Sequence, residues 1–227
     1  MKILESKELT RCYTVGGVEI SVLEGVSLSV EAGEFLVVKG SSGSGKSTLL
    51  SLLSGLDRPT RGRVILDGAD ITHWSEDRLA PLRNEKIGFV FQGFHLVPSL
   101  TALENVAFPA ELKGDLRATS RALDLLRRVG MEARKDNFPH QLSGGEKQRA
   151  AICRALVNRP RIVFADEPTG NLDSVNGQAV LDLLLELRRQ EGATLLMVTH
   201  SMDIARSADR IVLLEDGRIQ GEIPPHS

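Results

Sequence analysis

The chain has 227 residues, of which 41% are hydrophobic and 26% charged, so it can bury one sizeable core or a core with a smaller satellite. Its formal net charge of −2 gives no electrostatic reason to expect nucleic acid as the main partner. No stretch approaches the roughly 18 apolar residues that a membrane-spanning helix needs, and the opening MKILESKELT lacks the apolar core of a signal peptide. We therefore expect a soluble, intracellular protein in which Cys12 and Cys153 are free thiols, because their spacing suggests no metal site.

The first 30 residues alternate apolar and polar side chains on both sides of Gly16-Gly17, which predicts short antiparallel strands joined by a tight turn. Tyr13 lies just before this turn, where an aromatic side chain is equally consistent with ordinary packing in a strand. Residues 62–71, GRVILDGADI, repeat the strand-and-turn pattern around a central Asp-Gly pair.

Residues 40–48, GSSGSGKST, lie between the apolar run FLVVK and the amphipathic run LLSLLSGL, and they match the pattern G-x-x-x-x-G-K-[ST]. The glycines let consecutive backbone N–H groups turn toward a phosphate, and the helix that begins here points its positive dipole end at the same anion. Lys46 adds a positive charge, and Ser47 offers a hydroxyl to a magnesium ion. A structural Gly/Ser-rich turn is the alternative, but the flanking strand and helix favour a phosphate-binding loop.

Helices are predicted over most of residues 93–160, after the apolar strand KIGFVF of residues 86–91. Thr101 and Glu104 have the spacing of a capping box, which marks a helix N-terminus. A second helix is expected over residues 119–129, where the following glycine stops it.

Ser143 and Glu146 also have capping-box spacing, at the start of a helix that runs through KQRAAICRALV. Capping alone can explain the serine. It does not explain Gly144 and Gly145, which are poor helix formers and suit close approach of the backbone to a phosphate.

The apolar run RIVFADEP, residues 161–168, ends in two carboxylates that are costly at the edge of a core unless something pairs with them. A magnesium ion and a water molecule provide partners: Asp166 would hold the magnesium shell and Glu167 would accept a proton from the attacking water. A solvated acidic turn is the alternative, which the phosphate-binding loop makes less attractive.

The rest of the chain predicts a helix over residues 174–190, a buried strand over residues 194–199, His200 and a hairpin through an Asp-Gly pair. For His200 a histidine at the edge of the core remains an alternative. The final PPHS is too short for a further domain.

In order and spacing, these motifs resemble the ATPase subunits of ATP-binding-cassette (ABC) transporters over nearly the whole chain. The phosphate loop carries the resemblance together with Gln92, LSGGEKQR (142–149), FADEP (164–168), NLD (171–173) and His200. It implies an α/β fold, a P-loop NTPase with a RecA-like core, an antiparallel β subdomain and an inserted α-helical subdomain. It also implies one ABC ATPase domain, in which residues 1–92 and 160–227 form the core with the β subdomain and residues 93–159 form the helical subdomain.

The resemblance implies ATP as substrate and Mg²⁺ as cofactor. Tyr13 matches the aromatic that stacks on adenine, and Asp173 the D-loop aspartate that couples two ATP sites. The implied catalytic residues are Glu167, His200, Gln92 and Lys46, and the implied metal ligands are Ser47, Gln92 and Asp166. The residues implied to bind ATP are Tyr13, Gly40, Ser41, Ser42, Gly43, Ser44, Gly45, Lys46, Ser47, Thr48, Gln92, Ser143, Gly144, Gly145, Asp173 and His200.

The resemblance also implies a head-to-tail homodimer. In the family, the helix that begins within LSGGEKQR, the signature motif, is not expected to contact the phosphate loop of its own chain. Each ATP would lie between the phosphate loop of one chain and Ser143, Gly144 and Gly145 of the other. The second implied partner is an integral membrane permease that docks on the segment from Gly93 to Leu112. The dimer would then sit on the cytoplasmic face of the inner membrane.

The stretches FQGFHLVPSLTALENVAFP and EPTGNLD resemble the branch of LolD, MacB and YbbA-type ATPases, which implies a MacB/FtsX-like permease. Many other cassettes carry Ser-Ala-Leu-Asp where this chain has Gly-Asn-Leu-Asp at residues 170–173. Cargo in this branch includes lipoproteins, peptides and amphiphilic drugs, and the sequence does not choose among them. An FtsE-like regulatory ATPase that moves no cargo is the alternative, and a soluble non-transport ABC ATPase is a more distant one.

The loop after Gln92 holds four apolar side chains, more than local folding requires. For Leu96 and Val97 we expect contact with the permease. For Phe94 and Leu100 a small core beneath the helical subdomain is an equally good explanation.

Overall fold

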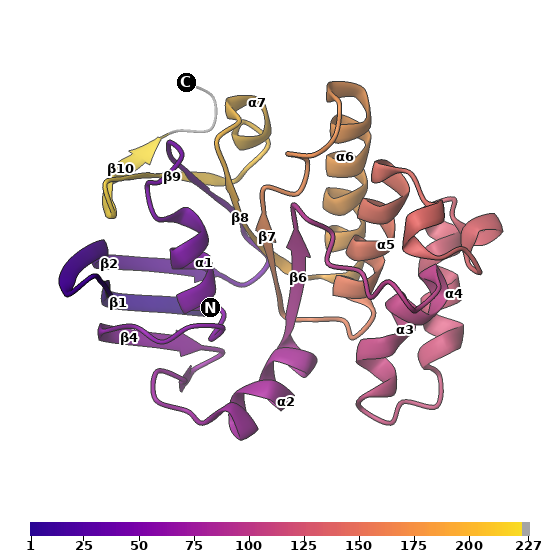
Figure 1. The fold of residues 1–227 in the computed structure, drawn as a ribbon, viewed down its shortest axis with the longest axis horizontal. Coiled ribbons are helices and arrows are strands. Elements are labelled where there is room, and N and C mark those ends of the chain that lie inside the picture. Colours follow the sequence, from indigo (N-terminus) through magenta and orange to yellow (C-terminus); the bar gives the residue numbers. More distant parts are fainter. Residues whose placement is uncertain (224–227) are drawn as a thin grey trace. The chain divides into compact units, whose positions relative to one another are not determined.

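The structure is a computed structural model that describes residues 1–223 (Figure 1). Its internal contacts divide the chain into two compact units, one of Met1–Arg83 with Thr194–Ser227 and one of Asn84–Ala193. The expectation for the final PPHS lies outside the described residues. The division of the chain at residues 93 and 159 stays a prediction.

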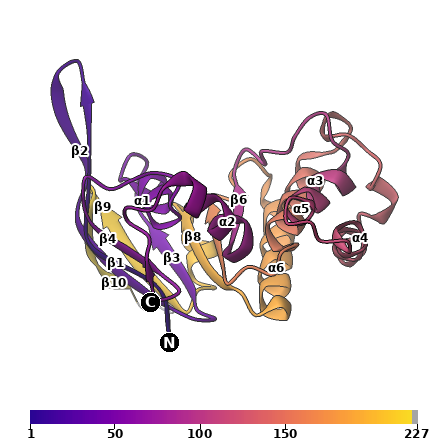
Figure 2. The same cartoon turned by 90° about the horizontal axis from the view of Figure 1, so that it is seen from below.

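In the first unit an antiparallel sheet has the order β2-β1-β4-β5. Its strands are β1 (Lys2–Val15), β2 (Val18–Glu31), β4 (Arg61–Leu66) and β5 (Ala69–Asp70). The predicted turn at Gly16-Gly17 is confirmed, with both glycines at positive φ. The strands β1 and β2 are 14 residues each, longer than predicted, because bulges let the pairing continue past each irregularity. Figure 2 shows their hairpin projecting beyond the neighbouring strands.

A second sheet includes four strands of the first unit: β3 (Phe35–Lys39), β8 (Thr194–Thr199), β9 (Arg210–Glu215) and β10 (Arg218–Ile223). The strand β3 lies between β8 and β9 and runs parallel to both, and β9 pairs with β10 through the predicted hairpin. Leu36, Val37 and Val38 are completely buried, which fits the continuous apolar run of a central parallel strand.

The helices α1 (Lys46–Leu53) and α7 (Met202–Ala205) belong to the first unit, and α2 (Glu76–Lys86) begins in it and ends in the second. The sequence did not predict α2, because Leu79 is its buried residue and Pro81 interrupts it, so no apolar stripe marks a helix. It did not predict α7 either, because a helix of four residues is too short to have a periodicity.

The second unit holds two parallel strands, β6 (Ile87–Phe91) and β7 (Ile162–Asp166), and four α-helices. These are α3 (Ala102–Glu111), α4 (Ala118–Arg128), α5 (Gly144–Leu156) and α6 (Ser174–Glu191), with short 3₁₀ turns at Glu132–Arg134 and Pro139–Gln141. The expected strand and helices are confirmed to within about two residues, apart from Lys86, which ends α2. Gly88 of β6 lets α5 pack closely, because a Cβ atom there would lie 2.4 Å from the backbone oxygen of Ala155.

Both predicted capping boxes are present. Thr101 N donates to Glu104 Oε2 at 2.8 Å, and Glu104 N donates back to Thr101 Oγ1 at 3.2 Å. Ser143 N and Glu146 N make the same pair of bonds at the start of α5, at 2.8 and 3.3 Å. The two cysteines are free thiols, with Cys12 half-buried and Cys153 buried. Among the described residues, no helix combines the length and the apolar character needed to cross a membrane.

Candidate functional site

The phosphate loop, residues 40–48, connects β3 to α1 and folds around the ammonium group of its own lysine. Lys46 Nζ donates to the backbone oxygen of Gly40 at 3.0 Å and to that of Ser41 at 2.8 Å, and the side chain is buried. Ser44 N donates to Ser41 O at 3.2 Å, which closes a turn beside the lysine. A buried positive charge therefore lies inside the loop, at the N-terminus of a helix.

Two glycines of the loop leave no room for a side chain. A Cβ atom at Gly40 would lie 2.2 Å from the backbone oxygen of Leu214, and one at Gly45 would lie 2.8 Å from Leu23 Cδ2. Gly45 also has φ 98°, a left-handed conformation that favours glycine. The packing of β2 and β9 against the loop thus explains these two positions.

The first turn of α1 has no side-chain cap and no acidic residue. Four other helices begin with a side chain that accepts a backbone N–H bond: Thr101, Ser143, Asp173 and Ser201. Ser44 Oγ is buried and has no hydrogen-bond partner within the described part of the chain. Uncapped N–H groups beside a buried ammonium group attract an anion, so the loop fits the phosphates of a nucleotide.

Tyr13 of β1 is fixed by two neighbours of the same unit. The guanidinium carbon of Arg11 lies 4.4 Å from the ring centroid, and the phenol donates to Asp57 Oδ2 at 3.0 Å. Arg11 Nη2 donates to Asp57 Oδ1, also at 3.0 Å, while Asp57 N donates to Ser51 O of α1. Tyr13 is 38% exposed, which argues against ordinary core packing. It forms a platform for a planar group, tied to the helix of the phosphate loop.

The sequence reasoning missed Arg11 and Asp57. The two residues are 46 positions apart, and no local pattern joins them. Only the fold shows that both contact Tyr13.

His200 follows β8, which pairs in parallel with β3 so that Thr199 lies opposite Lys39. The carboxyl ends of the two strands therefore meet at one edge of the sheet. His200 and Gly40 are the next residues at this edge, so the predicted catalytic histidine lies beside the start of the phosphate loop.

In the second unit, β6 and β7 pair in parallel with Phe91 opposite Asp166. Gln92 and Glu167 follow directly, so the predicted glutamine and both carboxylates lie at one edge of this strand pair. Asp166 and Glu167 are half-buried. Glu167 has φ 43°, and such strained backbone in a non-glycine residue clusters at functional sites.

Gly144 and Gly145, at the start of α5, have different surroundings in the structure. A Cβ atom at Gly144 would lie 3.2 Å from Leu172 Cδ2, so packing gives this glycine a structural reason. Gly145 is buried, but a Cβ atom there would meet only ordinary contacts, the nearest at 3.7 Å. Packing therefore leaves Gly145 unexplained, which favours the approach of a ligand at this position.

Asp173 is the N-cap of α6, where it accepts from Asn176 N at 3.0 Å. This bond, with a second from the Asn176 side chain, holds the pKa of Asp173 below its ordinary value. The predicted coupling residue thus stays ionised and also has a structural role.

The predicted residues divide between the two units. Tyr13, the phosphate loop and His200 belong to the first, and Gln92, Ser143, Gly144, Gly145, Asp166, Glu167 and Asp173 belong to the second. The predicted metal ligands Ser47, Gln92 and Asp166 offer hydroxyl, amide and carboxylate oxygens. This set fits Mg²⁺, which prefers oxygen ligands.

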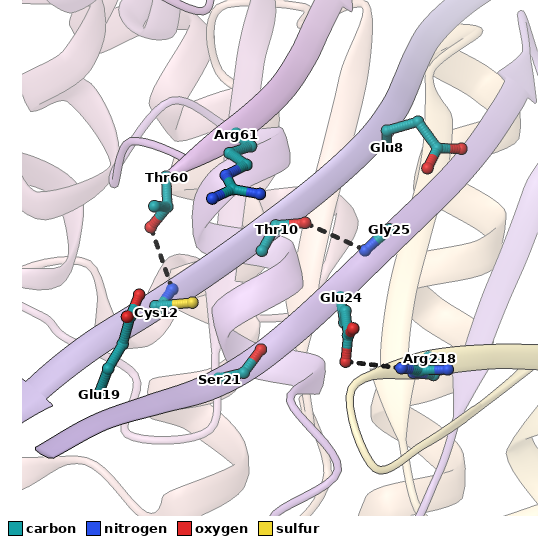
Figure 3. Close-up of a pocket in the computed structure, with 10 residues that line it drawn as sticks. All are labelled: Glu8, Thr10, Cys12, Glu19, Ser21, Glu24, Gly25, Thr60, Arg61 and Arg218. Atoms are coloured by element: carbon teal, nitrogen blue, oxygen red, sulfur yellow. Dashed lines mark hydrogen bonds and ion pairs between the residues drawn. The ribbon is translucent and has the colours of Figure 1, made fainter.

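A pocket of about 660 Å³ lies over β1, β2, β4 and β10 of the first unit, and none of these predicted residues lines it. Figure 3 shows its lining residues. Its lining combines three glutamates with Arg61 and Arg218, and Arg218 is paired with Glu24 at 2.8 Å. Charges of both signs give it no clear ligand preference, so it adds nothing to the candidate site.

Comparison with known proteins places these features in one family. A family model described as "ABC transporter" matches residues 23–170. The chain is 46% identical over 98% of its length to a macrolide export ATP-binding/permease protein MacB of Syntrophobacter fumaroxidans, but spans only 32% of that protein. It is 45% identical to a lipoprotein-releasing system ATP-binding protein LolD of Idiomarina loihiensis, with 97% of each chain covered.

Among solved structures, a dimeric post-hydrolysis state of the ATP-binding cassette MJ0796 bound to ADP and Pi superposes with a TM-score of 0.90. It is 41% identical and 99% of each chain is covered. The α/β fold with a phosphate loop is therefore that of an ABC ATPase cassette, as the motifs predicted. The chain belongs to the ABC transporter family and is one of its ATP-hydrolysing cassettes.

Proposed function

We propose that this chain is the ATPase subunit of a LolD- or MacB-like transporter, in which ATP closes a head-to-tail homodimer. The observation that carries the ATP site is the phosphate loop, with buried Lys46 inside it and an uncapped helix at its end. Tyr13 would stack on adenine, and ATP would replace the two backbone carbonyls that Lys46 now contacts.

For hydrolysis, Glu167 is the proposed general base and takes a proton from the attacking water. Gln92, at the same strand edge, orients that water, and His200 contacts the γ-phosphate from the first unit. Mg²⁺, held by Ser47, Asp166 and Gln92, would neutralise charge on the phosphates. Gln92, Asp166, Glu167 and His200 each end or directly follow a strand at its carboxyl end, where α/β sheets bind ligands.

Replacing Glu167 by Gln tests the site. The variant keeps the shape of the side chain but not its basicity, so we expect ATP binding to persist and turnover to fall about 10²- to 10⁴-fold. Gel filtration with ATP and Mg²⁺ should then reveal a trapped dimer. The matched control is Glu186→Gln, an exposed carboxylate of α6, which should hydrolyse ATP like the wild type. Near-normal turnover by Glu167→Gln would remove it as the base.

The dimer is supported by the similar cassette MJ0796, which was solved as a dimer. In the proposed arrangement Ser143, Gly144 and Gly145 of one chain meet the ATP held by the other. The γ-phosphate is then the ligand that both chains contact, and its loss on hydrolysis lets the dimer open.

A membrane permease is the second proposed partner, with docking on the segment from Gly93 to Leu112. This segment exposes apolar side chains: Val97 is 38% exposed, Phe108 42% and Leu112 66%, while Leu96 is half-buried. Asn105 bonds both N and O of Val97, which holds the loop in one shape before any partner arrives. Preordered exposed apolar residues suit an apolar helix of a partner.

The Leu96→Asp/Val97→Asp double variant tests this surface, since charges placed there would enter an apolar interface without partners. We expect basal ATPase activity to be kept and co-purification with the permease from detergent extracts to be lost. Leu56→Asp, at an exposed leucine of the first unit, is the control. Wild-type recovery of the permease with the double variant would place docking elsewhere.

The cargo proposed is a lipoprotein, a peptide or another amphiphile. The names of the relatives support it, because one is a lipoprotein-releasing system protein and the other a macrolide export protein. The location that follows is the cytoplasmic face of the membrane that contains the permease.

A further inference from the structure

Gln92 is joined to the turn between β7 and α6 by a reciprocal pair of hydrogen bonds. Asn171 Nδ2 donates to the backbone oxygen of Gln92 at 2.9 Å, and Gln92 Nε2 donates to Asn171 Oδ1 at 3.2 Å. All of these groups belong to the second unit. The turn itself is closed by two backbone bonds, from Gly170 N to Glu167 O and from Leu172 N to Thr169 O, each at 3.0 Å.

This pair of bonds determines which way both amides face. A backbone carbonyl can only accept, so Asn171 must turn its NH₂ group toward Gln92 O. Its side-chain oxygen then faces the Gln92 amide and accepts from the NH₂ group there. The remaining atom, Gln92 Oε1, is therefore directed away from Asn171.

Gly170 provides the space that this arrangement needs. A Cβ atom there would lie 2.7 Å from Gln92 Nε2 and 3.1 Å from Gln92 Cδ, although the Gly170 backbone is outside the left-handed region. Room for the Gln92 amide, rather than backbone conformation, thus explains the glycine. Gly170 and Asn171 are also the two positions where this chain departs from Ser-Ala-Leu-Asp, and an alanine at 171 could make neither bond.

We propose that Asn171, with room provided by Gly170, is a positioning residue that presents the oxygen of Gln92 to Mg²⁺. The inference rests on the proposed function, in which Gln92 is a metal ligand. Mg²⁺ takes oxygen ligands in strict geometry, so an inverted amide would offer it an NH₂ group instead. Asn171 acts before the metal arrives, because the bonds are present in the protein alone.

The first test examines the nucleotide-free protein by NMR of side-chain amide groups. Asn171→Ala should shift the Gln92 NH₂ resonances and speed their hydrogen exchange. Gly170→Ala should shift them too, because it displaces the same amide. Gln178→Ala removes an exposed amide of α6 that donates to Asp182 Oδ1 at 2.8 Å, and should leave the Gln92 resonances unchanged. Unshifted Gln92 resonances in Asn171→Ala would overturn the proposal.

The second test measures ATP binding by calorimetry in the Glu167→Gln background, with Mg²⁺ and then with EDTA. Asn171→Ala should reduce the Mg²⁺-dependent gain in affinity about 3- to 10-fold, the equivalent of about one hydrogen bond, and leave affinity in EDTA unchanged. Asn171→Asp should retain more of this gain than Asn171→Ala, because a carboxylate oxygen can still accept from the Gln92 NH₂ group although it cannot donate to Gln92 O. An equal loss with and without metal would make Asn171 merely structural and refute positioning.

Gln92→Ala distinguishes a failure of the metal role of Gln92 from a failure of the positioning role of Asn171. If it leaves the Mg²⁺-dependent gain intact, the metal role of Gln92 in the proposed function is wrong and the positioning role falls with it. If Gln92→Ala reduces the gain and Asn171→Ala does not, only the positioning role is refuted.

Discussion

Removal of the Asp57 carboxylate should weaken nucleotide binding although Asp57 itself is not a proposed ligand. The carboxylate accepts from Tyr13 Oη and Arg11 Nη2, each at 3.0 Å, and its own backbone N–H is bonded to Ser51 O of α1. In Asp57→Ala the ring loses its anchor, and Arg11 loses the partner that holds its guanidinium group over the ring.

The magnitudes follow from the contacts. The Arg11–Asp57 pair is partly exposed, at 22% and 30%, and such pairs contribute about 0.2–1 kcal/mol. The phenol bond adds about 1 kcal/mol, so the free energy of unfolding should fall by about 1–2 kcal/mol. Ordering a loosened side chain again on binding costs about 0.5–1.5 kcal/mol, so nucleotide affinity should fall about 2- to 10-fold. Tyr13→Ala should cost more, because it removes the stacking itself, about 1–3 kcal/mol.

Urea unfolding and calorimetric titration with ADP measure the two effects separately. Tyr13→Phe, which keeps the ring and loses the hydroxyl, should lie between wild type and Asp57→Ala. Glu5→Ala removes the Lys2–Glu5 pair on the same strand and should bind ADP normally. If Asp57→Ala loses stability as calculated but binds ADP with wild-type affinity, the Arg11–Tyr13–Asp57 cluster supports the fold and not the nucleotide.

Two further predictions concern titratable groups, and a third the phosphate loop. Three groups hold the pKa of Glu146 below its ordinary value: the backbone N–H of Ser143, then the Ser143 hydroxyl and Arg134. The stability that ionised Glu146 gives the fold is therefore present above about pH 4.3, the ordinary pKa of a glutamate, and is lost as the pH falls through the lowered pKa. In urea unfolding, the advantage of wild type over Glu146→Gln should accordingly shrink from about pH 6 to about pH 3.5. Burial raises the pKa of Cys153 to about 12, so a thiol reagent at about pH 8 should label one cysteine in the native protein and both in urea. Gly40→Ala should abolish ADP binding in calorimetry, because its Cβ atom would lie 2.2 Å from a backbone oxygen and force the loop to move.

Local patterns predicted a large part of this structure. The turn at Gly16-Gly17 and the caps at Thr101 and Ser143 are all present, because a turn or a cap depends on a few adjacent residues. The pattern failed for α2, because Pro81 lies inside the helix and Leu79 is the residue that it buries, so no apolar stripe marks it. Such helices depend on tertiary packing, which overrides intrinsic preference.

In the candidate site, contacts between residues far apart in the sequence could not be predicted. The phosphate loop and the carboxylates after β7 were recognisable because each lies within one short motif. Asn171 and Gln92 are 79 positions apart, and Asp57 and Tyr13 are 44 apart. These contacts are made only after strands and helices are arranged, so a single sequence carries no signal for them.

Ser143 shows that a structural and a functional role need not exclude each other. From the sequence, a capping serine was an alternative to a phosphate ligand, and the structure contains the cap: Ser143 Oγ accepts from Glu146 N. A hydroxyl also has one proton to donate, and it can rotate about its C–O bond. In this structure a hydrogen bond from the Ser143 hydroxyl helps to lower the pKa of Glu146. In the proposed dimer, rotation would let the hydroxyl donate to the γ-phosphate of the ATP held by the other chain, while Oγ still accepts from Glu146 N and α5 keeps its cap.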